Sequence, residues 1–141
     1  MVMNMIEWAR KTRDGTVEYS ENGKIIHCGR SFCSWLNQKC VEHLSTLAGR
    51  ISAVRTRFRH TRLTPIPISG ELLFIPLKGL RSADCLLVNH KALTGWKRTE
   101  DNHLIISFSS SLTLEVQSKR ILLKQCEKAK AITDYLNDRT G

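Results

Sequence analysis

The chain has 141 residues, of which 41% are hydrophobic and 6% aromatic, which indicates one folded domain spanning residues 1–141 and excludes a disordered chain. Its 22 lysines and arginines against 13 acidic residues give a net charge of +9, which favours a polyanionic partner. No apolar run approaches the ~18 residues of a membrane span, and residues 1–10 lack a signal-peptide apolar region, so we expect a cytoplasmic protein without membrane contact.

Three strands are predicted near the N-terminus. Met5–Lys11 and Thr16–Ser20 flank Asp14-Gly15, a pair typical of hairpin turns. Glu21–Gly23 forms a second turn before a third strand at Lys24–Cys28. The next segment, residues 31–44, is ambiguous, but a helix there would have an apolar face made of Phe32, Trp35, Leu36 and Cys40.

Residues 44–60 predict a basic amphipathic helix. Four apolar residues recur at i, i+4, i+7 and i+11: Leu47, Ile51, Val54 and Phe58. From residue 43 to residue 70 there is no Asp or Glu, but there are five arginines: Arg50, Arg55, Arg57, Arg59 and Arg62. Guanidinium groups bind phosphates in a bidentate manner and enter narrow minor grooves, so this segment is predicted to be an anion-binding surface, with nucleic acid as the first candidate partner. A solvated charged face without a ligand is the alternative.

The arginines would fall into two sets on a continuous helix. Arg50 and Arg57 lie seven residues apart, close to two turns, and Arg55, Arg59 and Arg62 follow another line. The two lines diverge, so we expect one set to contact phosphates and the other the floor of a groove, with Arg50 and Arg57 as first candidates for the groove. For Arg50 the alternative is a salt bridge that fixes the helix.

The second half predicts short strands and a final helix. Pro65 and Pro67 impose extended geometry on the chain. The predicted strands are Ile66–Ile68, Leu72–Ile75, Cys85–Val88, His103–Phe108 and Leu112–Val116. From Ser118, a possible cap, a helix is predicted whose apolar face we assign to the core in preference to an interface: Leu122, Cys126, Ala129, Ile132 and Leu136. The same segment holds a second basic run, Lys119, Arg120, Lys124, Lys128 and Lys130.

This order of elements predicts an α+β fold: a single domain with a largely antiparallel β-sheet, a central basic amphipathic helix and a C-terminal helix.

Metal binding and catalysis are not predicted. The spacing of Cys28, Cys33, Cys40 and His43 lacks the tight Cys-x2-Cys pair of structural zinc sites, and the odd count of five cysteines suits free thiols in a reducing compartment. Cys85 opens an apolar run, so we expect a buried thiol, although Asp84, Asn89 and His90 are close in sequence. We expect Asp84 to end a loop by bonding backbone amides. The sequence predicts no enzyme and no cofactor.

Several short motifs occur in a defined order. They are Gly49-Arg50 eight residues after Cys40, then Thr64–Ser69, Leu73–Pro76, Asp84-Cys85 and Asn89-His90. Their order and spacing over residues 40–92 resemble the bacterial competence transcription factor family (ComK), and a weaker likeness continues through residues 99–116.

The chain departs from the family pattern at two places. It has Phe74–Leu77 (Phe-Ile-Pro-Leu) where such proteins tend to have Phe-Phe-Pro-Thr, and Leu86-Leu87 where an aromatic residue is usual. The sequence ends at Gly141, so we expect it to lack the C-terminal extension through which family members engage the adaptor of a proteolytic machine.

The resemblance implies a sequence-selective activator that binds paired A/T-rich boxes of double-stranded DNA through the minor groove, as a homo-oligomer, and raises transcription of DNA-uptake genes. It also implies a nucleoid-associated protein, with RNA polymerase and a proteolytic adaptor as further candidate partners. Lys78 and Arg81, in the loop before Asp84, are additional candidate DNA-binding residues.

Two alternatives remain open. One is an RNA- or single-strand-binding module, because tryptophans among basic residues can stack on unpaired bases. Trp96 is the tryptophan in such a context, since Lys97 and Arg98 follow it, although we prefer a role for its side chain in packing. The other is an interaction protein whose basic face docks on an acidic partner.

Overall fold

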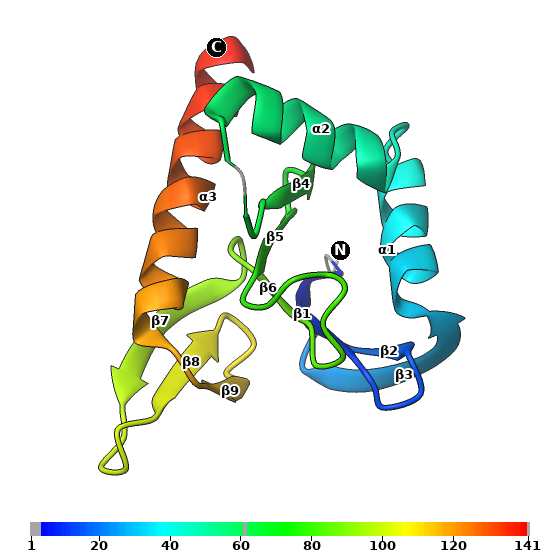
Figure 1. Cartoon of the computed structure of the whole chain (residues 1–141). Helices are drawn as coiled ribbons and strands as arrows, with labels where there is room; N and C mark the ends of the chain where they lie inside the picture. Colours follow the sequence, from blue (N-terminus) through cyan, green and yellow to red (C-terminus); the bar gives the residue numbers. More distant parts are fainter. Residues whose placement is uncertain (1–3, 61, 141) are drawn as a thin grey trace.

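The computed structural model describes residues 4–60 and 62–140, and in this part of the chain it has three helices and nine strands (Figure 1). The predicted domain of residues 1–141 also includes residues 1–3, 61 and 141, which lie outside the described residues. In chain order the elements are β1 (Ile6–Lys11), β2 (Thr16–Glu21), β3 (Lys24–Ser31), α1 (Phe32–Val41), α2 (Leu47–Phe58), β4 (Ile66–Ser69), β5 (Leu72–Pro76), β6 (Leu86–Asn89), β7 (Leu93–Arg98), β8 (Leu104–Phe108), β9 (Thr113–Val116) and α3 (Lys119–Thr140).

The strands form two antiparallel sheets, which confirms the predicted α+β class. One sheet has the order β3-β2-β1-β6-β5-β4, and the other has the order β7-β8-β9. β7 was not predicted, because it contains Gly95 and exposes most of its side chains, so no apolar alternation marks it. It pairs with β8 along Trp96 and Ile106, which extends the predicted hairpin of β8 and β9 to three strands.

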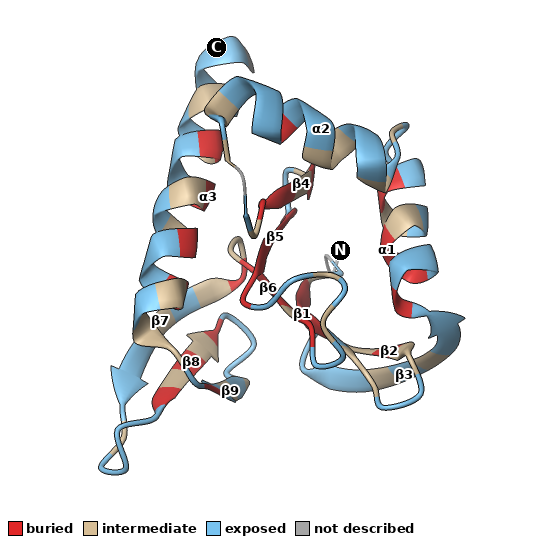
Figure 2. Cartoon of the chain, in the orientation of Figure 1, coloured by how far each residue is buried: buried red, intermediate tan, exposed pale blue. Residues whose placement is uncertain are grey.

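The six-stranded sheet separates two hydrophobic cores. α1 packs over β2 and β3, while α3 and the three-stranded sheet share the core on the opposite face. In β5 the side chains alternate between the two cores, Leu72 and Phe74 on one side and Leu73 and Ile75 on the other. All of β5 is therefore buried (Figure 2).

The ambiguous segment forms α1. The Ser31 hydroxyl accepts a hydrogen bond from the Ser34 amide at 3.4 Å and caps the helix. The four apolar residues that would form a helical face are all buried: Phe32, Trp35, Leu36 and Cys40.

α2 is shorter than the predicted helix of residues 44–60. The Thr46 hydroxyl accepts a hydrogen bond from the Gly49 amide at 3.0 Å, so the helix begins after Thr46. It ends at Phe58 because Arg59 has a left-handed backbone, with φ of 59°. Arg62 is therefore not on the helix, and the predicted helical line through Arg55, Arg59 and Arg62 is wrong.

The apolar stripe of α2 joins the two cores. Leu47 and Ile51 pack against the core under α1, whereas Val54 and Phe58 pack against the core under α3. α2 thus runs between α1 and α3 across the end of the sheet, and its outer side is exposed (Figures 1 and 2).

α3 covers the sheets with its apolar face. The Ser118 hydroxyl accepts a hydrogen bond from the Ile121 amide at 3.2 Å, so the predicted cap is confirmed. Leu122, Ala129 and Ile132 are buried, which confirms the assignment of this face to the core, while Leu136 near the C-terminus is 45% exposed. No helix in the described part of the chain is long and apolar enough to cross a membrane.

Candidate nucleic-acid interface

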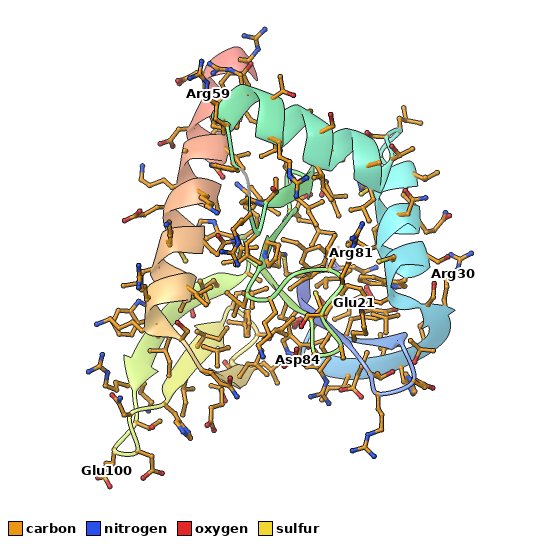
Figure 3. The ribbon with its side chains drawn as sticks, viewed as in Figure 1. Glu21, Arg30, Arg59, Arg81, Asp84 and Glu100 are labelled. Atoms are coloured by element: carbon orange, nitrogen blue, oxygen red, sulfur yellow. The ribbon has the colours of Figure 1, made fainter. Side chains whose placement is uncertain are left out.

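The predicted arginines are distributed over α2 and the loop that follows it. Arg55, Arg57 and Arg59 are exposed, Arg50 is half-buried, and Arg62 is exposed on the loop to β4. Figure 3 shows Arg59 at the end of α2, beside the C-terminal part of α3. Four of these side chains line three different hollows, Arg50 and Arg57 one, Arg55 another and Arg62 a third, so each is considered with its own contacts.

Arg50 and Arg57 lie on the same side of α2, as predicted, in a hollow between α2 and α3. The Arg50 Nη2 donates a hydrogen bond to the His43 carbonyl at 3.0 Å, in place of the salt bridge considered from the sequence. The guanidinium of Arg57 lies over the Tyr135 ring, 4.5 Å from its centroid. A hydrogen bond from Arg57, aided by the nearby charge of Arg139, lowers the pKa of Tyr135. Both arginines thus contribute to holding α2 in place.

Arg55 points to a different hollow, which contains a second predicted residue. Its Nε donates a hydrogen bond to the hydroxyl of buried Thr64 at 2.9 Å, which fixes the stem of the guanidinium. The hollow has a volume of about 450 Å³ and is also lined by Arg81, from the loop between β5 and β6 (Figure 3). We call it the Arg55–Arg81 hollow. The fold therefore brings together two arginines that are distant in sequence.

Lys78 has an acidic partner. It forms an ion pair with Asp84, whose carboxylate also accepts a hydrogen bond from the Ser82 hydroxyl at 2.8 Å. The bond from Lys78 and, to a smaller extent, the bond from Ser82 lower the pKa of Asp84. The sequence suggested that Asp84 would bond backbone amides, but its main partners are side chains. The charge of Lys78 is partly neutralised, unlike that of Arg81.

A second basic hollow lies between α3 and the loop that carries Arg62. It has a volume of about 270 Å³, and its cationic lining residues are Arg62, Arg120, Lys124 and Lys128. We call it the α3 basic hollow. The sequence showed the basic run of α3 but gave no reason to place it beside Arg62, so these three α3 residues were not among the predicted site residues.

Both hollows lack negative charge. None of the described residues that line either of them is an aspartate or a glutamate. Leu63 lines both, so the two hollows are neighbours. Burial, and then the charge of Lys124, lower the pKa of Lys128. Together the hollows form a cationic surface suited to a polyanion.

Two of the residues near Asp84 that resemble catalytic groups, Cys85 and Asn89, are buried parts of the core. Burial raises the pKa of Cys85 to about 12, so its thiol stays protonated at neutral pH, as expected for a core cysteine. Asn89 is fully buried and uses its side-chain amide to bond backbone groups of three neighbouring segments. Burial and then the charge of Lys91 lower the pKa of His90.

The cysteines considered for zinc lie in different surroundings. Cys40 is buried in the core under α1, whereas Cys33 is exposed. Within residues 4–60 and 62–140, no three His, Cys, Asp or Glu side chains are placed to hold a metal ion together.

The model of one protein family, described as ComK protein, matches residues 3–141, nearly the whole chain. No curated protein and no solved structure matches the chain at a significant level.

Proposed function

The chain belongs to the ComK family, a family of competence transcription factors and not of enzymes, and from this premise we propose that residues 1–141 form one DNA-binding domain that activates DNA-uptake genes. The domain recognises A/T-rich boxes of double-stranded DNA through the minor groove. It acts in the cytoplasm, on the nucleoid.

The observation that carries this proposal is the acid-free basic surface beside α2. Arg55 and Arg81 line one hollow without a carboxylate among its described lining residues, and the α3 basic hollow adjoins it. A solvated charged face normally mixes both signs, and uncompensated guanidinium groups in a concave site favour phosphate or a narrow groove of negative potential.

We assign different roles to the predicted site residues. Arg55 and Arg81 enter the minor groove, since they lie in one hollow and Thr64 positions Arg55. Arg59 and Arg62 contact phosphates. Lys78 contributes once DNA competes with Asp84 for its charge. Arg50 donates from Nη2, at the tip of its guanidinium, and Arg57 lies over the Tyr135 ring, so we assign both to the support of α2 and not to the groove. Arg55 bonds Thr64 through its Nε.

Assembly and partners extend the proposal. Paired boxes require at least two protomers, so the protein binds DNA as a homo-oligomer. RNA polymerase, as the target of activation, and a proteolytic adaptor, as the agent of turnover, are the protein partners that fit a competence activator.

The test is a titration of the protein with an A/T-box duplex, a G/C-rich duplex and a single strand, each at several salt concentrations. We expect preference for the A/T duplex and an affinity that falls steeply with salt, because phosphate contacts release counterions. The Arg55→Lys and Arg81→Lys variants should lose roughly tenfold in A/T-over-G/C preference while keeping non-specific binding, because a groove contact is worth about 1–3 kcal/mol and ammonium is more strongly hydrated than guanidinium. Binding that does not depend on salt would exclude nucleic acid as the partner.

A single-strand-binding function is the second candidate, and Trp96 is the observation that favours it. Trp96 is 40% exposed on β7, and Lys119 Nζ lies 4.7 Å from the centroid of its ring. Exposed aromatic rings beside cations stack on unpaired bases. If the single strand outcompetes both duplexes and Trp96→Ala abolishes that preference, this function replaces the first.

A further inference from the structure

The α3 basic hollow is a fixed feature of the fold. Gln125 of α3 is buried, and its Nε2 donates hydrogen bonds to the Leu63 carbonyl at 2.7 Å and to the Pro76 carbonyl at 2.9 Å. Lys128 Nζ donates to the Arg62 carbonyl at 2.9 Å. The loop after α2 is thereby attached to α3, and Figure 1 shows this loop running beside the helix. The position of Arg62 relative to the α3 cations is set by these bonds.

The cations of α3 repel one another in the free protein. Arg120, Lys124 and Lys128 follow each other at intervals of four residues, the spacing at which like charges destabilise a helix. Elsewhere on the same helix this spacing joins opposite charges, since Lys130 pairs with Asp134 at 3.0 Å. The burial and nearby Lys124 charge that lower the pKa of Lys128 are consistent with this crowding.

The start of α3 adds to the positive potential. Arg120 lies in the first turn, which contains no acidic residue, and the partial charge of a helix N-terminus is positive. Arg120 and Lys124 have no ion-pair partner among the described residues that line the hollow, and they lie beside a loop that the buried Gln125 attaches to α3. An anion bound there would offset the repulsion between these cations.

We propose that the α3 basic hollow binds backbone phosphates of the DNA, so that the DNA-binding surface continues from the Arg55–Arg81 hollow past Leu63 onto α3. This inference rests on the proposed function and gives α3 an anchoring role, separate from base recognition. Lysine and arginine contacts to phosphate fix the position of a duplex but carry no sequence information.

The experiment measures the salt dependence of duplex binding for three single variants. Arg120→Gln and Lys124→Gln each remove a cation from the hollow, and within the described part of the chain neither side chain makes a bond to the loop after α2 like the one that Lys128 donates to Arg62. Lys130→Gln is the matched control, because it removes the same charge from the same helix outside the hollow. Thermal unfolding of each variant verifies that it is folded, and we expect no fall in the midpoint temperature.

Each lost phosphate contact should reduce the slope of log affinity against log salt by about 0.9. We therefore expect slopes shallower by about 0.9 for Arg120→Gln and Lys124→Gln, no change for Lys130→Gln, and an unchanged A/T-over-G/C preference in all three. If the wild type binds duplex steeply with salt but the two hollow variants match the control, the α3 site is wrong and the proposed function stands. If the wild type does not bind duplex DNA, both are wrong.

Discussion

Replacement of Asn89 tests whether one buried amide fixes the order of the central strands. Its Oδ1 accepts hydrogen bonds from the Leu73 amide at 3.0 Å and the Lys91 amide at 3.1 Å. Its Nδ2 donates to the Ile6 carbonyl at 2.7 Å and the Glu71 carbonyl at 2.9 Å. The side chain thus uses both donors and both lone pairs to join β6 to the starts of β1 and β5.

The expected loss of stability follows from the groups left unpaired. In Asn89→Ala the Leu73 amide and the Ile6 carbonyl lose a partner in buried positions. An unsatisfied buried polar group costs about 1–3 kcal/mol, and a small cavity adds to this, so the total is about 3–5 kcal/mol. That is a large part of the stability of a small domain and corresponds to a fall of about 10–15 °C in the unfolding midpoint.

The assay is thermal unfolding followed by circular dichroism, with the exposed Asn4→Ala as control. Asn89→Asp provides a pH test. Burial opposite two carbonyl oxygens should raise the pKa of the new carboxyl, so this variant is most stable at low pH and loses stability as the pH rises through that pKa. An unfolding midpoint of Asn89→Ala within 3 °C of the wild-type midpoint would refute the reasoning, because such a shift corresponds to a loss of only about 1 kcal/mol in stability.

Two further predictions concern titrating groups at the surface. The chain has two tyrosines, Tyr19 and Tyr135. A hydrogen bond from Arg57 lowers the pKa of Tyr135, whereas burial raises the pKa of Tyr19, so the absorbance of the tyrosines should show two ionisation steps as the pH rises. Arg57→Gln should raise the pH of the lower step and leave the upper step unchanged. One step common to both proteins would contradict the contact. Hydrogen bonds from Thr12 and then Thr16 lower the pKa of Asp14 to about 2, so its contribution to stability is complete above about pH 4 and is lost as the pH falls towards 2. In Asp14→Asn the free energy of unfolding should therefore depend less on pH between about pH 2 and pH 4 than in the wild type. Parallel curves for the two proteins in this range would exclude a contribution from Asp14.

Elements with a regular apolar pattern could be predicted from the sequence. The stripe of α2 and the face of α3 have helical spacing because each helix buries one side, and α1 could be proposed from its four apolar residues. Turn residues located the first hairpins, since Gly15 and Gly23 have positive φ angles that favour glycine. The strand β7 escaped prediction because it exposes most of its side chains.

The helix ends were harder to predict, and they changed the candidate site. The charge pattern continues beyond Phe58, but the left-handed backbone of Arg59 ends α2 there. Arg62 consequently leaves the helical line and meets α3. Local sequence carries no information on that contact, because it depends on Gln125, 62 residues from its partner Leu63. The same holds for Arg55 and Arg81, which only the packing of the β5–β6 loop under α2 brings together.

Charge alone therefore does not rank the candidate DNA-binding residues of this chain, whereas the contacts of each cation within the protein provide a ranking. Arg57 has an aromatic partner and Lys78 a carboxylate, so DNA must compete with an existing contact to engage either. Arg81 and Lys124 lie in hollows whose described lining residues include no carboxylate, so binding a phosphate or a groove there breaks no ion pair with a lining residue. Because the cost of breaking an ion pair is subtracted from the gain on binding, the two acid-free hollows are the stronger candidates for contact with DNA, although the arginines of α2 are the more conspicuous feature of the sequence.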